Sequence, residues 1–217
     1  MSRRRRGAET AGPWSYGELT RDDIVAAGLR LTRRRGFADL SMRKLAGELG
    51  SPSMNAYYYI KDKQHLLDLV ADSVLGEVEP PPTDLSWELQ LSILFEQGRV
   101  VLLRYPGVAQ HLLRRMVGLP NEVRLYRAIT EILLTAGFDR STSDRAQRVF
   151  AYLLFGAVTS ELATSAAAGQ HSAMTFSDDK EVFGFGLDLL IEGMRPLRSE
   201  VSAIRPSHRD VDAGRAT

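Results

Sequence analysis

The fold is decided by residues 40 to 68, with the sequence LSMRKLAGELGSPSMNAYYYIKDKQHLLD. Ser41 is placed to cap a short helix over 42–49, because a serine hydroxyl can accept a hydrogen bond from a free backbone N–H of the first turn. Gly50 ends this helix, and a further short helix is expected after the turn Gly50-Ser51-Pro52, running through about Tyr58. Two helices joined by a tight turn containing glycine form a helix-turn-helix.

Similar signals place one helix before this motif and one after it. Thr20 and Asp23 have the spacing of a capping box at the start of a helix over 21–35, which Gly36 ends. Asp62 is placed to cap a helix from 63 to about 78. We therefore expect a helix-turn-helix domain over 19–70, preceded by a disordered basic arm over 1–18.

Longer amphipathic segments follow the prolines at 80–82. Their apolar spacing predicts helices at about 87–104, 108–117, 120–136, 142–168 and 178–194, and no segment has the pattern of a strand. The chain is therefore expected to be all-α, with the N-terminal three-helix domain followed by a larger helical domain over 71–196. Residues 197 to 217 are expected to form a flexible tail.

Charge is distributed unevenly along the chain. Residues 1 to 63 contain 13 Lys and Arg against 7 Asp and Glu, whereas the remainder contains 15 against 20, so the formal net charge of +1 conceals a basic front end. Such asymmetry suggests a polyanionic partner for one end only. A solvated surface with a loose basic tail would give the same counts.

Several functional classes receive no support from the sequence. Cysteine is absent, which excludes disulfides and thiolate metal sites, and the four histidines are scattered. Neither a nucleophile motif nor a phosphate-binding glycine loop occurs, so we expect no enzyme and no cofactor. The longest apolar stretch, 149–158, is shorter than the roughly 20 residues of a membrane span. With no apolar leader after the N-terminal arginines, we expect a cytoplasmic protein with no membrane association.

The three consecutive tyrosines at 57–59 are the most informative residues of the motif. A helix would spread them roughly 100° apart around its axis, so most of them need a partner outside the core. Ala56 and Ile60 lie four residues apart and can face the interior. The residues left facing outward, wholly or in part, are Ser53, Asn55, Tyr58 and Tyr59.

A phenol on a positively charged surface can bond phosphate oxygens through its hydroxyl and touch thymine methyl groups with its ring. Lys61 and Lys63 supply positive charge beside the tyrosines, and a phosphate at this helix N-terminus would suit both the ammonium groups and the free N–H groups. The guanidinium of Arg43 suits the O6 and N7 atoms of guanine. The alternatives are that the tyrosines tether the third helix to the fourth, and that the three cations are ordinary solvated side chains.

The segment from about Thr20 to Val70 resembles the DNA-binding domain of the tetracycline-repressor (TetR) family. This resemblance implies that Arg43 reads a base and that Ser53 and Asn55 face bases. It also implies that the tyrosines touch backbone or thymine, and that Lys63 binds phosphate. The implied DNA-binding residues, with the neighbouring lysine included, are Arg43, Ser53, Asn55, Tyr57, Tyr58, Tyr59, Lys61 and Lys63.

A helix-turn-helix reads few base pairs, so two copies usually act across a two-fold axis. The apolar segments 148–163 and 181–194 could form a four-helix bundle between two subunits, as the family's dimerisation helices do. The alternative is that both segments fill the core of their own chain. The residues expected at the dimer interface are Phe155, Gly156, Phe183, Leu187, Leu190, Ile191 and Met194.

The resemblance also implies a ligand cavity between 87–136 and the inner side of 146–158. A mixture of aromatic, flexible and polar groups there suits a small, largely apolar effector, although each residue could equally be plain core. The expected function is a ligand-responsive DNA-binding repressor; a transcriptional activator, or a helical carrier without DNA, are the alternatives. The candidate cavity residues are Phe95, Arg99, Leu102, His111, Met116, Tyr126, Ile129, Thr130, Phe150 and Leu154.

Overall fold

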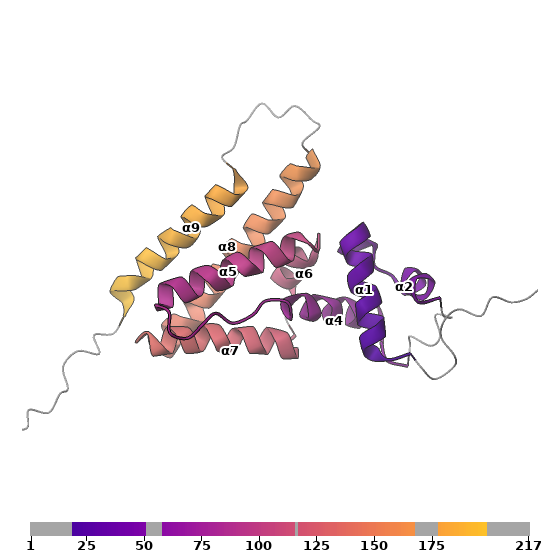
Figure 1. Cartoon of the computed structure of the whole chain (residues 1–217), viewed down its shortest axis with the longest axis horizontal. Helices are drawn as coiled ribbons and strands as arrows, with labels where there is room; N and C mark the ends of the chain where they lie inside the picture. The colour runs from indigo at the N-terminus through magenta and orange to yellow at the C-terminus, as the bar shows by residue number, and fades with distance from the viewer. Residues whose placement is uncertain (1–18, 51–57, 116, 168–177, 199–217) are drawn as a thin grey trace, which may run out of the picture.

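The structure is a computed structural model that describes residues 19–50, 58–115, 117–167 and 178–198. Throughout these ranges the regular elements are helices, as predicted (Figure 1). The expected basic arm, the helix preceding Tyr58, the loop after 168 and the tail beyond 198 lie outside the described residues. The domain boundaries at 19, 71 and 196 remain predictions.

The N-terminal part begins with α1 (Arg21–Arg35), which starts at the predicted capping box. The Thr20 hydroxyl accepts a hydrogen bond from Asp23 N at 3.2 Å, and the Asp23 carboxylate accepts one from Thr20 N at 2.9 Å. After the short helix η1 (Phe37–Asp39), α2 (Met42–Leu49) starts at Ser41, whose hydroxyl accepts from Lys44 N. Local capping therefore sets where these helices begin.

Helix α4 (Lys63–Leu75) is capped by Asp62, as predicted, and ends three residues before the predicted end at 78. Ile60 is fully buried just ahead of it, which agrees with its expected place in the interior. Along its length α4 packs first against α1 and then against the helices of the larger domain. One unbroken helix thus joins the two parts of the chain (Figure 1).

The larger domain is built from α5, α6, α7, α8 and α9, with the long α8 at its centre (Figure 1). Helix α8 contacts each of the other four, and some of its apolar side chains, such as Val149 and Tyr152, stay exposed. By length and composition alone one stretch of α8, of which 22% is buried within the chain, could also cross a membrane, which differs from the sequence expectation. A single helix of this kind is weak evidence for a membrane span. The bounds are α5 (Trp87–Leu103), α6 (Val108–Arg114), α7 (Pro120–Thr135), α8 (Arg140–Ala167), α9 (Asp179–Met194) and η2 (Arg195–Leu197).

Helix α6 ends at Arg114 rather than at the predicted 117. Arg115 has an extended backbone, and the buried carboxylate of Glu122 accepts hydrogen bonds from the N–H groups of Val117, Gly118 and Leu119. Those N–H groups would point to α6 carbonyls if the helix continued. A local contact at the start of α7, made by Glu122 three to five residues further along the chain, therefore accompanies the early end of α6.

The predicted dimer stripe of α9 lies inside its own chain. Phe183, Leu187, Ile191 and Met194 are buried, Leu190 is half-buried, and Phe155 of α8 is buried as well. The alternative interpretation, that this stripe fills the chain's own core, describes its position. The opposite side of α9 is apolar too, because its exposed side chains include Val182, Phe185 and Leu189.

Candidate DNA-contacting surface and ligand cavity

The residues predicted to meet DNA are exposed wherever the structure describes them. Tyr58 is 81% exposed and Tyr59 is 44% exposed, so neither ring is folded under the first two helices. Arg43 on α2 and the two lysines, Lys61 and Lys63, are exposed as well. Ser53, Asn55 and Tyr57 lie outside the described residues.

This exposed group is held by a well-anchored turn. Ile60 is buried between Tyr59 and Lys61, and Asp62 fixes the start of α4 by accepting a hydrogen bond from His65 N at 2.8 Å. The N–H of Lys61 donates to Nδ1 of His65 at 3.2 Å. The phenols of Tyr58 and Tyr59 therefore precede the buried Ile60 in the chain, and the ammonium groups of Lys61 and Lys63 follow it. Ile60 and the cap by Asp62 hold the backbone between them in place.

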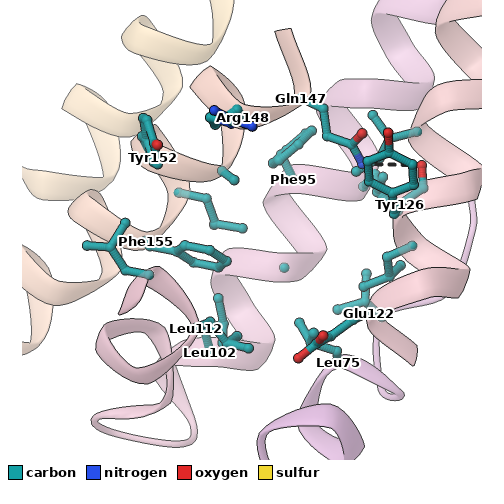
Figure 2. A pocket seen from close by; sticks show the side chains of 18 of the residues that line it. Leu75, Phe95, Leu102, Leu112, Glu122, Tyr126, Gln147, Arg148, Tyr152 and Phe155 are labelled. Atoms are coloured by element: carbon teal, nitrogen blue, oxygen red, sulfur yellow. Dashed lines mark hydrogen bonds between the residues drawn. The ribbon is translucent and has the colours of Figure 1, made fainter. Parts of the chain in front are cut away.

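A cavity of about 480 Å³ lies in the larger domain, among α4, α5, α6, α7 and α8 (Figure 2). Its wall is mostly apolar, which suits a small organic ligand. Of the predicted cavity residues, five line it: Phe95, Leu102, Tyr126, Ile129 and Leu154. The wall also includes residues that the sequence interpretation missed, among them Leu75, Leu112, Arg115, Glu122, Gln147, Arg148 and Tyr152.

Four predicted cavity residues point elsewhere, and Met116 lies outside the described residues. Arg99 is buried and pairs with Glu161 at 2.7 Å from Nη1 to Oε2. Phe150 stacks on Phe95 with ring centroids 5.1 Å apart, outside the wall itself. Thr130 is buried on α7, and His111 contacts α4. The spacing of apolar residues in the sequence predicts which residues lie inside the domain, but it does not show which of them line the cavity.

The carboxylates at the cavity wall are already engaged. Glu122 is 5% exposed, and its Oε2 atom accepts from three backbone N–H groups. Asp144 accepts from the hydroxyl of Tyr126 at 2.6 Å and pairs with Arg140 at 3.2 Å. Neither carboxylate is therefore a free negative charge in the cavity.

Comparison with known proteins places the chain among transcriptional regulators, although no protein-family model matches its sequence. An HTH-type transcriptional regulator from Saccharopolyspora erythraea is 33% identical over 144 residues, 66% of this chain, and the match spans 61% of that relative. The class D tetracycline repressor protein from Escherichia coli is 27% identical over 197 residues, which cover 81% of this chain and 88% of the repressor.

Solved structures agree with these sequence matches. A TetR variant from Acinetobacter baumannii, in complex with minocycline, superimposes with a TM-score of 0.73 at 26% identity, covering 84% of this chain and 99% of that one. BioQ from Mycobacterium smegmatis gives 0.69 at 28% identity, with coverage of 83% and 99%. The chain belongs to the TetR family.

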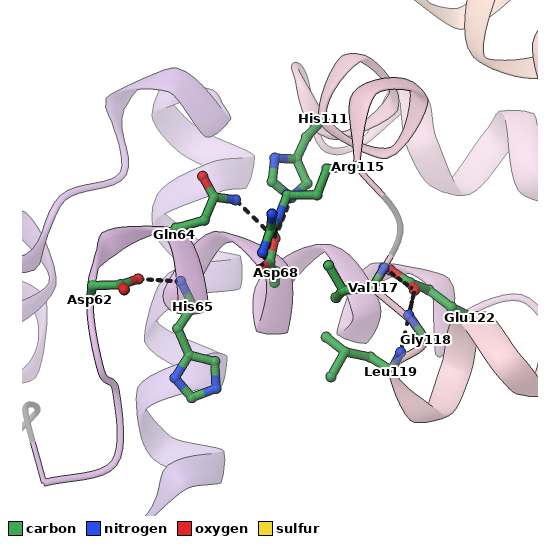
Figure 3. Close-up of polar contacts among 10 residues, drawn as sticks. All are labelled: Asp62, Gln64, His65, Asp68, His111, Arg115, Val117, Gly118, Leu119 and Glu122. Atoms are coloured by element: carbon green, nitrogen blue, oxygen red, sulfur yellow. Dashed lines mark hydrogen bonds and ion pairs between the residues drawn. The ribbon is translucent and has the colours of Figure 1, made fainter.

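In this TetR-family chain, α4 begins just after the exposed tyrosines, and Leu75 at its end lines the cavity. Figure 3 shows the polar contacts of α4 with α6. Asp68, in the middle of α4, accepts from Nε2 of His111 at 2.9 Å and from Nε of Arg115 at 3.1 and 3.2 Å. Gln64 donates to the same carboxylate at 2.9 Å. Burial alone would raise the pKa of Asp68, but these hydrogen bonds and the charge of Arg115 outweigh it and lower that pKa below its ordinary value.

One turn further along α4, Asp72 holds the start of α7. Its Oδ1 atom accepts from the backbone N–H groups of Asn121 and Glu122 at 2.9 and 3.0 Å. Because α7 has no side-chain cap of its own, a carboxylate from another helix satisfies its first N–H groups. Two aspartates of α4 therefore attach it to α6 and α7, two of the helices that border the cavity.

The TetR-family chain has a second joint between its two parts. The N–H of Phe37, just after α1, donates to Pro106 O at 2.8 Å, and Arg33 donates to the Tyr105 hydroxyl at 2.6 Å. Gly107 has φ +94°, and a Cβ atom there would lie 3.0 Å from Cβ of Phe37. Glycine is required at this position because both the backbone angle and the close approach exclude a side chain.

Proposed function

We propose that the protein is a ligand-responsive transcriptional repressor in the cytoplasm, which binds a palindromic DNA operator as a homodimer and is released by a small, largely apolar effector. The observation that carries this proposal is the exposure of Tyr58 and Tyr59 beside Lys61 and Lys63. Phosphate and thymine are suitable partners for exposed phenols that lie beside positive charge.

The relatives support the direction of this proposal. Curated matches include tetracycline repressor proteins and an HTH-type transcriptional repressor from Streptomyces coeruleorubidus, the latter 26% identical and matched over 78% of its length. The basic balance of residues 1 to 63 agrees with a polyanionic partner at this end. In this proposal Arg43, Ser53 and Asn55 read bases, and Tyr57 joins the other tyrosines at the backbone.

The homodimer is supported by an apolar surface on α8 and α9, which we call the α8–α9 face and define by its exposed residues. A monomer has no use for so many exposed apolar groups at one place, and a second copy of the same face would cover them. At Gly156 an added Cβ atom would meet no other described atom within 4 Å, so this position permits close approach of a partner helix. The α8–α9 face consists of Val149, Tyr152, Gly156, Val182, Phe185 and Leu189.

The effector site in this proposal is the cavity of about 480 Å³. A solved relative contains minocycline, a small molecule, and its fold superimposes on this chain over most of its length. Effector binding would favour a state in which the two DNA-contacting surfaces no longer match an operator. Only a ligand that prefers that state can release the DNA.

To test the proposal, the full-length protein is used to select the sequences that it binds from a pool of random DNA duplexes. The duplex that is enriched most is then titrated with the protein at several salt concentrations. We expect Tyr58→Ala and Lys63→Ala to weaken binding, and Lys63→Ala to lower the salt slope by about 1, because one phosphate contact is lost. Arg43→Ala should also relax base preference at one position.

Arg127→Ala, an exposed arginine of α7, is the matched control and should leave the titration unchanged. Wild-type affinity and slope for the Tyr58, Lys63 and Arg43 variants would contradict the assignments. Absence of any salt-sensitive duplex binding would instead favour the carrier without DNA. A promoter fused to a reporter separates repressor from activator by the sign of the change.

A further inference from the structure

We propose that the effector carries an acidic group, and that this group binds Arg115 and draws it away from Asp68 of α4. This inference rests on the proposed role of the cavity as the effector site. It adds the chemical class of the ligand, an apolar body with a carboxylate or a similarly acidic oxygen, and the contact through which that ligand acts.

The charge of the cavity wall is the first reason. Arg114, Arg115 and Arg148 line the cavity, against the carboxylates of Glu122 and Asp144. Both carboxylates are satisfied within the chain, as described above, whereas Arg114 and Arg148 pair with no carboxylate among the described residues. The rest of the wall is largely apolar, so the cavity favours a molecule that is apolar with a negative charge.

The geometry of Arg115 is the second reason. Its side chain is 49% exposed and reaches Asp68 through Nε alone, at 3.1 and 3.2 Å from the two carboxylate oxygens. Within the described part of the chain its two Nη groups donate no hydrogen bond. A guanidinium has five N–H donors in a planar fork, so these groups remain able to bind a second anion in bidentate fashion.

The surroundings of Asp68 are the third reason. If Arg115 turns to a ligand, Asp68 still accepts from His111 at 2.9 Å and from Gln64 at 2.9 Å. Both of these hydrogen bonds are to Oδ1, so Oδ1 keeps two partners and only Oδ2, which Arg115 alone contacts among the described residues, loses its own. One Arg–carboxylate pair is exchanged for another. The cost of leaving Oδ2 without its partner must be offset by the new ion pair between Arg115 and the acidic group, together with burial of the ligand's apolar body.

The exchange would loosen α6 from α4. Arg115 lies at the end of α6, and α4 begins four residues after Tyr59 (Figure 3). An acidic ligand would thus change a contact of the helix that carries the DNA-contacting surface. A neutral ligand of the same shape would fill the cavity and leave the contact in place.

The experiment compares two fluorescent probes with the same ring system. 8-Anilinonaphthalene-1-sulfonate is an anion, and N-phenyl-1-naphthylamine is its uncharged counterpart; each is titrated into the full-length protein. We expect the anion to bind more tightly, and Arg115→Gln to weaken the anion about ten-fold, because a charge-assisted hydrogen-bond pair is lost, with the neutral probe unchanged. Arg127→Gln on α7 is the matched control and should change neither titration.

Asp68→Asn gives a second, opposite expectation. Removal of the competing carboxylate should leave Arg115 free for the probe and tighten binding of the anion. If the anionic probe only adsorbed to an exposed apolar surface, substituting Arg115 and substituting Asp68 would not change its affinity in opposite directions. Arg115→Lys keeps the positive charge without the fork, and we expect it to lose less affinity than Arg115→Gln.

Equal affinity for the two probes, or loss of both probes to the same extent in Arg115→Gln, would overturn the proposal. Thermal unfolding of each variant shows that it is folded before it is titrated. These titrations contain no DNA, so they can fail while operator binding succeeds. Conversely, loss of duplex binding in the earlier test leaves the preference for an anion measurable.

Discussion

Gly28 of α1 packs closely against Val70 of α4. A Cβ atom at this position would lie 2.5 Å from Cγ2 of Val70, a separation that requires one of the helices or the valine to shift. Gly47, in the middle of α2, is the opposite case, because no described atom lies within 4 Å of its Cβ position. The packing of α1 against α4 therefore favours a glycine at position 28, whereas no packing contact with a described residue favours one at position 47.

We expect Gly28→Ala to lower the free energy of unfolding by about 1 to 3 kcal/mol, the usual range for adding a methyl group to a packed contact. Gly47→Ala should raise it by roughly 0.5 to 1 kcal/mol, since alanine loses less backbone entropy in a helix. Urea unfolding of both variants measures the two changes. Equal effects of the two substitutions would show that α1 and α4 are not in such close contact.

Asp68 makes stability depend on pH in a defined direction. Its pKa is lowered in the folded chain, so its contribution is complete above its ordinary pKa of 3.8 and is lost as pH falls through the lower, folded value. We expect the stability difference between the wild type and Asp68→Asn to be largest near neutral pH and to shrink below about pH 4. Urea midpoints from pH 7 to pH 3 measure this, and a constant difference would contradict it.

At the scale of the element, the start of α7 depends on a residue from another helix. Leu119 precedes α7 and provides no side-chain oxygen, and Asp72 of α4 accepts from Asn121 N and Glu122 N instead. Its negative charge also lies at the positive end of the α7 dipole. The border of the cavity is therefore built by α4 and α7 together.

We expect Asp72→Ala to lower the free energy of unfolding by about 2 to 3 kcal/mol, because several hydrogen bonds to a buried carboxylate are lost. Asp84→Ala, which removes an exposed carboxylate that precedes α5, should change it by less than about 0.5 kcal/mol. Thermal unfolding of the pair gives the comparison. An equally small effect at Asp72 would mean that α7 forms without this cap.

The helix starts could be predicted from the sequence because their signals are local. Thr20, Ser41 and Asp62 each bond an N–H group three residues on, and each predicted helix begins where expected. The end of α6 is predicted three residues too late, although Glu122 lies only three to five residues from the N–H groups that it bonds. The cap of α7 could not be predicted, because Asp72 lies 49 and 50 residues before the N–H groups that it bonds. Local capping is visible in a sequence, whereas capping by a distant helix is not.

The cavity and the α8–α9 face show a second limit of sequence patterns. Phe95 and Leu154 line the cavity as predicted, but Arg99 does not, because its partner Glu161 is 62 residues away. On α9 both sides are apolar, and the stripe with the more regular spacing belongs to the chain's own core. Periodicity finds an apolar side of a helix but does not tell which neighbour covers it.

At the scale of the whole molecule, the α8–α9 face gives a direct prediction about assembly. Phe185 of α9 is 67% exposed, more than any other large apolar side chain of that face. We expect Phe185→Asp to convert the proposed homodimer into a monomer, because burying an unpaired carboxylate at an interface is strongly unfavourable. Sedimentation velocity measures the change in mass.

Val100→Asp is the control, because it places the same charge at a half-exposed valine of α5, a helix that contributes no residue to this face. It should leave the sedimentation of the protein unchanged. A wild-type protein that sediments as a monomer would contradict the homodimer itself, whereas a Phe185→Asp variant that remains dimeric would place the interface on another surface.

The backbone hydrogen bond from Phe37 to Pro106 has a consequence for protein engineering. A chimeric regulator made by grafting a foreign helix-turn-helix onto this effector domain at 62 would also bring a foreign residue opposite Gly107, which lies so close to Phe37 that a Cβ atom added at Gly107 would come within 3.0 Å of the Phe37 Cβ. The transplantable cassette is therefore discontinuous in sequence: it comprises the N-terminal helices together with the short turn that contains Tyr105 and Gly107.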